Sequence, residues 1–119
     1  MTVRRIKTYS SETGYVYQYH FEEVRPGQRR AGRDGSEYVF VVSRDRKHNF
    51  AVPVFFRRTA LEAWEQTSGR QLTGTEEYAA VKMRLLRAFD EVEDLESQRL
   101  TIEVTPENIP ELLAPLDIG

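Results

Sequence analysis

Aromatic residues recur at every second position near the start of the chain. Tyr15, Tyr17, Tyr19 and Phe21 alternate with more polar residues, which places them on one face of a strand covering residues 15–24. They are the clearest strand signal in the sequence.

Three further segments add strands to this one. Runs rich in β-branched and aromatic residues at 37–43 and 50–56 predict two strands joined by a polar turn. Residues 3–9 alternate less regularly and are a weaker candidate for a hairpin partner of the first strand. Pro53 cannot donate a ladder hydrogen bond, which predicts an edge or a bulge at that point. The first half of the chain therefore predicts an antiparallel meander of three or four strands.

The segment 25–36 between the first two strong strands contains a proline, three glycines and many charged residues. These residue types interrupt regular structure. We therefore expect an exposed, mobile loop there.

From Thr59 onward the apolar period becomes helical. Thr59 and Glu62 have the spacing of a capping box, and Gly69 supplies a stop, so we expect a short helix between them. Thr73 and Glu76 form a second such pair. It opens a longer predicted helix, at about 75–95, with an apolar stripe of Tyr78, Val81, Leu85, Leu86, Ala88, Phe89 and Val92.

The last twenty residues predict one more strand and one more helix. Leu100, Ile102 and Val104 alternate with polar residues, and Thr105 followed by Pro106 resembles a helix start. Strands followed by helices indicate the α+β class, with two to three helices packed on one face of a three- to five-stranded antiparallel β-meander. A length of 119 residues suits one domain covering 1–119.

The formal charge of -2 conceals a division of the chain into two halves. Residues 1–58, mainly strands, hold 12 Lys and Arg against 6 Asp and Glu. Residues 59–119, mainly helical, hold 5 against 13. The sheet half is therefore basic and the helical half acidic.

Several classes of protein find no support in the sequence. There is no cysteine, and no apolar run of the roughly 18 residues that a membrane span needs. The basic N-terminus is not followed by the apolar run of a signal peptide. We find no nucleophile elbow and no nucleotide-binding glycine motif, and His20 and His48 have no ligand-like neighbours. We therefore expect a cytoplasmic, soluble protein without a cofactor or a metal, and a function other than catalysis.

Arginines gather where the predicted strands share an end. In an antiparallel meander, the segment after the first strand and the segment after the third lie at the same end of the sheet. The candidate anion-binding or partner-binding residues are Arg25, Arg29, Arg30, Arg33, Arg57 and Arg58. Guanidinium groups bind carboxylates and phosphates through paired hydrogen bonds. The alternative is a solvated loop whose charge keeps the protein soluble.

The tyrosines at 15, 17 and 19 allow two interpretations. They form an aromatic surface on which nucleic-acid bases could stack, or they are the core face on which the helices pack. A sheet with helices on one side needs such a core face, which favours packing.

The acidic stretch 90–96 would lie at the C-terminal end of the long helix, where carboxylates oppose the helix dipole. Catalytic carboxylates and a solvated outer face are both compatible with it. A third interpretation pairs these carboxylates with the arginine end of the sheet, within one chain or across a dimer.

The sequence thus favours a small interaction module that associates with itself or with another protein, through an arginine-rich end of the sheet that engages an acidic surface. The alternatives are a nucleic-acid-binding module that uses the same arginines, which a pI near 5.7 disfavours, and a small-anion-binding protein or enzyme. No membrane partner is expected.

Overall fold

Five strands form one sheet, in the order β1-β2-β3-β4-β5. The computed structural model describes residues 5–118. The first four strands are an antiparallel meander, and the short β5 runs parallel to β4. The strands are β1 (Lys7–Ser10), β2 (Val16–Arg30), β3 (Arg33–Ser43), β4 (Asn49–Arg57) and β5 (Glu103–Val104).

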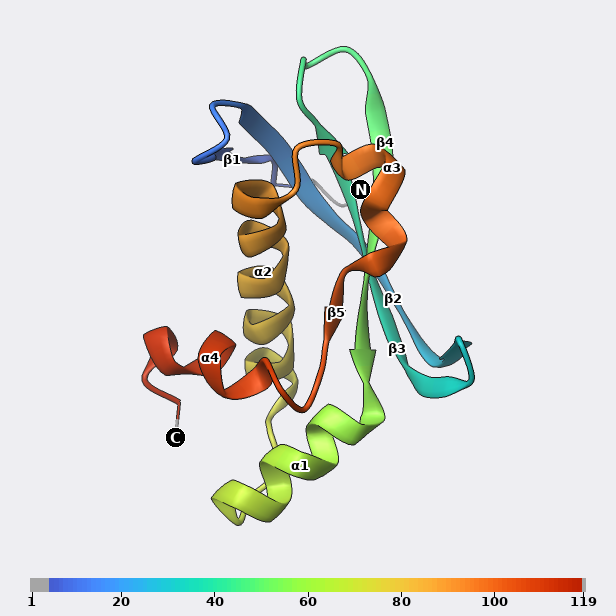
Figure 1. The fold of residues 1–119 in the computed structure, drawn as a ribbon, viewed down its shortest axis with the longest axis vertical. Helices are drawn as coiled ribbons and strands as arrows, with labels where there is room; N and C mark the ends of the chain where they lie inside the picture. The colour runs from blue at the N-terminus through green and yellow to red at the C-terminus, as the bar shows by residue number, and fades with distance from the viewer. Residues whose placement is uncertain (1–4, 119) are drawn as a thin grey trace.

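Four helices pack against this curled sheet (Figure 1). They are α1 (Arg58–Ser68), α2 (Gly74–Glu91), α3 (Leu95–Gln98) and α4 (Ile109–Leu113), with single 3-10 turns η1 (Arg99–Thr101) and η2 (Ala114–Leu116). The predicted α+β class and β-meander are confirmed. No helix within residues 5–118 is long and apolar enough to cross a membrane.

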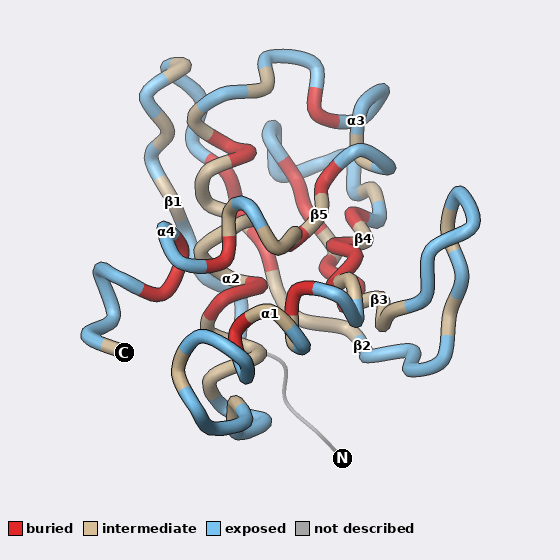
Figure 2. The backbone as a smooth tube through the Cα atoms, turned by 60° about the horizontal axis from the view of Figure 1, so that its bottom comes forward, coloured by how far each residue is buried: buried red, intermediate tan, exposed pale blue. Residues whose placement is uncertain are grey.

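The core lies between α2 and one face of the sheet, where buried segments from distant parts of the chain meet (Figure 2). The predicted stripe of α2 is turned inward, since Val81, Leu85 and Phe89 are fully buried. Tyr17 stacks on Phe89 with ring centroids 4.2 Å apart and planes inclined by 8°. The apolar side chains that recur at every second position of the strands therefore pack against those that recur every 3.6 residues of the helix, and together they form one apolar layer.

The predicted loop at 25–36 is wrong, because β2 and β3 continue through it as a long hairpin. Ala31 and Gly32 form its turn with φ of 51° and 77°, and two successive left-handed residues match the twist of a hairpin. Pro26 and Gly27 lie at a shift in register between Arg25 and Gln28. An irregularity of this kind accommodates a proline that cannot donate to the ladder.

The sequence predicted the start of α2 and the end of α1 correctly, and both have the predicted cap. The predicted start of α1 and end of α2 are wrong, and neither has a side-chain or glycine cap. The Thr73–Glu76 capping box is present at the start of α2, and Gly69 ends α1 in the left-handed conformation with φ of 79°. The capping box predicted at Thr59 is wrong, since α1 begins one residue earlier and its N-cap residue, Arg57, forms no side-chain cap. Helix α2 ends at Glu91, so most of the acidic stretch follows the helix instead of extending it.

The expected last strand is shorter than its alternation suggests. Residues 99–101 form the turn η1 and Leu100 is 60% exposed, so only Glu103 and Val104 pair with β4. Pro53 lies opposite Val39 of β3, but the short β5 does not reach the other side of β4 at this position. The Phe55 N–H donates toward Ile102, and Pro53, two residues earlier, presents its nitrogen to the same side.

Candidate functional site

The six candidate arginines are distributed along the far part of the β2–β3 hairpin and its base. We call residues 25–35 the arm. Arg25, Arg29, Arg30 and Arg33 belong to it, and Arg57 ends β4, where the register sets it opposite Gly35. The arm extends away from the body of the protein and is largely exposed (Figure 2).

Four of these arginines are matched by carboxylates of the same chain. The pairs are Arg25–Glu23 at 2.6 Å, Arg30–Glu37 at 3.4 Å, Arg57–Glu103 at 2.5 Å and Arg58–Asp34 at 2.7 Å. Arg29 and Arg33 have no carboxylate partner in the part of the chain that the structure describes. The uncompensated positive charge among the six therefore belongs to Arg29 and Arg33, which lie near the Ala31–Gly32 turn at the tip.

Arg30 attaches the arm to the sheet. Its guanidinium carbon lies 4.9 Å from the ring centroid of Phe55, and its Nη1 donates to the Leu100 carbonyl at 3.0 Å. Gly35 permits a close approach at the base of the arm, since a Cβ there would lie 2.2 Å from the Phe56 carbonyl oxygen. Arg30 therefore contributes to packing, and its side chain is too enclosed to be a free anion ligand.

A groove lies at the base of the arm, between the arm, α1 and the start of α2. It consists of two adjoining hollows of about 250 and 290 Å³ that share Arg58, Leu61 and Glu77. Leu61 and Leu72 supply apolar lining, and Glu62 and Glu65 of α1 add carboxylates. We call this feature the acidic groove. Among the described residues four carboxylates line it, those of Asp34, Glu62, Glu65 and Glu77. Its arginine, Arg58, is paired with Asp34, which leaves the three glutamates.

Glu77 extends the acidic groove inward to the core. The Tyr38 hydroxyl donates to its Oε1 at 3.2 Å. Burial and this carboxylate raise the pKa of Tyr38 to about 12. The sequence interpretation missed the acidic groove, although Glu62 and Glu65 have the three-residue spacing that puts two side chains on one side of a helix.

The predicted aromatic surface does not exist as an exposed platform. Tyr17 is fully buried, Tyr19 is 5% exposed, and Tyr15 is 40% exposed. The two inward tyrosines pack on Phe89 of α2, because the apolar face of α2 is buried against this face of the sheet. Of the three, Tyr15 alone is accessible for stacking.

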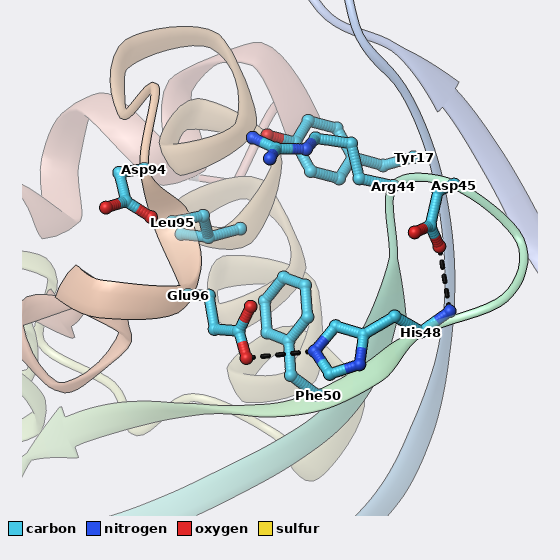
Figure 3. Close-up of a pocket in the computed structure, with 8 residues that line it drawn as sticks. All are labelled: Tyr17, Arg44, Asp45, His48, Phe50, Asp94, Leu95 and Glu96. Atoms are coloured by element: carbon cyan, nitrogen blue, oxygen red, sulfur yellow. Dashed lines mark hydrogen bonds and ion pairs between the residues drawn. The ribbon is translucent and has the colours of Figure 1, made fainter.

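A small pocket of about 60 Å³ lies at the other end of the sheet (Figure 3). The buried Tyr17 hydroxyl has no hydrogen-bond partner among residues 5–118. Figure 3 shows the Arg44 guanidinium beside it. Burial raises the pKa of Tyr17, and the positive charge of Arg44 partly opposes that rise. Arg44 is held by the Glu93 carbonyl at 3.1 Å and by the face of Tyr15, whose centroid is 4.3 Å away.

His48 and Glu96 close the opposite side of this pocket. His48 Nε2 lies 3.0 Å from Glu96 Oε2, and this carboxylate raises the pKa of His48. The His48 backbone N–H donates to Asp45 Oδ1 at 2.8 Å. No group of three or more metal-ligating side chains occurs within residues 5–118. His20 lies 3.3 Å from Glu22, so the two histidines have separate surroundings.

The acidic stretch 90–96 has structural partners other than the candidate arginines. Asp90 accepts the Tyr9 hydroxyl at 2.7 Å and the Glu12 N–H at 3.0 Å, which ties the end of α2 to the first hairpin. Glu96 faces His48. The expected pairing of this stretch with the arginine end therefore does not occur within residues 5–118 of one chain, where the arginines use Glu23, Asp34, Glu37 and Glu103.

Comparison with known proteins adds no relative. No family model, no curated protein and no solved structure matches this chain. The arm, the acidic groove and the small pocket are therefore the features that bear on its function.

Proposed function

We propose that this protein is a small, non-enzymatic interaction module whose arm engages an acidic protein surface. The observation that carries the proposal is the position of Arg29 and Arg33. Both are exposed, lie near the tip of an extended hairpin and lack an internal carboxylate partner within residues 5–118. Guanidinium groups held on a hairpin can grip carboxylates with paired hydrogen bonds.

Two observations make protein the favoured partner over nucleic acid. Four of the six arginines already have carboxylate partners, which reduces the charge available to phosphates. The aromatic side chains that would stack on bases are largely buried. A nucleic-acid module would need both features at its surface.

The test is a binding titration with a fluorescent poly-glutamate peptide. Wild-type protein should bind it at low salt and lose affinity as the ionic strength rises. The variant R29E/R33E should bind at least ten-fold more weakly. The matched control R46E/K47E makes the same change of net charge in the β3–β4 turn and should bind like the wild type.

The same titration decides against the proposal in two ways. Equal loss of affinity in the control would show a response to overall charge, without a role for the arm. Tight binding of single-stranded RNA or duplex DNA, with no binding of poly-glutamate, would replace the protein partner by nucleic acid.

The pocket at Tyr17 supports a second candidate function, the binding of a small anion. The buried Tyr17 hydroxyl donates to no acceptor within residues 5–118, which is costly, and the guanidinium of Arg44 stands beside it. An anion there would have to gain more from these two groups than it loses to the carboxylates of Asp45, Asp94 and Glu96, which also line the pocket. A carboxylate oxygen accepting from both groups would satisfy them. Acetate or formate should then raise the melting temperature of the wild type, and Y17F and R44Q should abolish the rise. Y15F, which keeps both donors, is the control.

A further inference from the structure

We infer that the acidic surface engaged by the arm is the acidic groove of a second copy of this chain, so that two copies exchange arms about a two-fold axis. This inference rests on the proposed function of the arm. It names the partner and the surface on it.

Charge complementarity is the first argument. The arm carries two guanidinium groups, those of Arg29 and Arg33, that have no carboxylate partner in the described part of the chain. The acidic groove carries the carboxylates of Glu62, Glu65 and Glu77. Glu62 and Glu65 are exposed and form no ion pair within residues 5–118. Each surface therefore holds the charge that the other lacks, and opposite charges on facing surfaces favour association and fix its register.

The form of the arm is the second argument. Strand β1 pairs with β2 only at residues 16–19, and the pairing of β4 with β3 stops at Gly35. Beyond that point the arm is a two-stranded ribbon, and neither of its edges pairs with another strand within residues 5–118. Such ribbons are marginal when isolated, and unpaired edges are sites at which another chain can dock.

The acidic groove offers the space that an incoming ribbon needs. One of its hollows is lined by Gly27 and Gln28 of the arm on one side and by Leu61 of α1 on the other. The arm and α1 therefore form the two walls of a notch. Leu61 and Leu72 are half-buried there, and the arm carries exposed apolar groups of its own, those of Pro26 and Ala31.

Two-fold symmetry favours a second copy of this chain as the partner of the arm. Each chain carries one arm and one acidic groove side by side, so a two-fold rotation seats each arm in the other chain's groove at the same time. A complex of this kind closes on itself and leaves neither surface free. A foreign acidic protein would satisfy the arm and leave the acidic groove empty.

The experiment is a charge exchange between the two surfaces, read by light scattering after size exclusion at low salt. Wild-type protein should be a dimer at concentrations of tens to hundreds of micromolar. R29E/R33E and E62K/E65K should each be monomeric. Mixed in equal amounts, these two variants should form a dimer, because the acidic arm meets the basic groove and the basic arm meets the acidic one. The control R46E/K47E should remain a dimer.

Three outcomes overturn the inference: a monomeric wild type, a mixture of variants that stays monomeric, or a dimer that persists in both charge-reversed variants. Far-UV circular dichroism establishes that each variant is folded. The poly-glutamate titration separates the two proposals. A monomeric wild type that binds the peptide through Arg29 and Arg33 keeps the interaction module and removes the second copy, whereas a monomer that binds no peptide removes both.

Discussion

The rings of Tyr17 and Phe89 stack with centroids 4.2 Å apart, and both side chains are fully buried. This contact joins the second strand to the last turns of α2 across 72 positions of sequence. It is one of the contacts that hold the helix on the sheet, and it brings the Tyr17 hydroxyl to the wall of the small pocket.

Truncation of Phe89 should therefore destabilise the protein strongly. Phe89→Ala removes a stacked, buried ring and leaves a cavity, which costs about 3–5 kcal/mol of unfolding free energy. Urea denaturation measures this loss. Leu100→Ala, at a side chain that is 60% exposed, should change stability by no more than about 0.5 kcal/mol. A similar effect of both substitutions would contradict the assignment of the core.

Gly35 should tolerate no side chain. A Cβ at this position would lie 2.2 Å from the Phe56 carbonyl oxygen and 2.8 Å from Phe55 Cζ, so Gly35→Ala forces the arm away from β4. We expect a loss of about 1–3 kcal/mol, as for other overpacked sites. Gly74→Ala is the matched control, because a Cβ there meets nothing within 4 Å and alanine favours the helix. Thermal unfolding should separate the two variants, and equal melting temperatures would refute the close approach.

The two threonines predicted as helix caps should differ in their effect on stability. Thr73 accepts the Glu76 N–H and Glu76 accepts the Thr73 N–H, so Thr73→Ala should cost about 1 kcal/mol. Thr59→Ala should cost little, since Thr59 lies inside the first turn of α1 and caps nothing. Chemical denaturation of both variants provides the comparison, and an equal loss at Thr59 would restore the original prediction.

Alkaline pH should weaken the fold through Tyr9. The hydrogen bond to Asp90 raises the pKa of Tyr9 to about 12 from an ordinary value of 10.0. The unfolded chain therefore releases this proton at lower pH than the folded chain does. The stabilisation is complete below pH 10 and is lost as the pH rises toward 12. Denaturation at several pH values should show this decline.

Tyr9→Phe tests the origin of that decline. The variant should be less stable at neutral pH, because Asp90 loses a donor, and its stability should fall less between pH 10 and 12. Part of the decline should remain, since the pKa of Tyr38 is also raised to about 12 by burial and Glu77. An unchanged slope in Tyr9→Phe would mean that the Tyr9–Asp90 bond does not form in solution.

The predictions that succeeded depend on residues close together in the chain. Alternation in 15–24 and the stripe of α2 report which side of an element is apolar, and Thr73 and Gly69 act on backbone groups within one turn. The predictions that failed concern segments in which the conformation favoured by the local residues competes with hydrogen-bonded pairing between strands. Residues 25–36 contain the signals of a loop, yet pairing of the two long strands, with Arg30 on Phe55 and Leu100, continues the ladder through them.

Periodicity, capping signals and composition were sufficient to predict the class of the fold, the order of its main elements, the inward face of the long helix and the separation of basic and acidic halves. Which charges remain available depends on the tertiary structure. It neutralised four of the six arginines, left Arg29 and Arg33 at the tip of the arm, and placed Glu62 and Glu65 beside its base. The reason is that periodicity and capping are local, whereas an ion pair, a groove or a buried hydroxyl forms between segments that the fold brings together from distant parts of the chain.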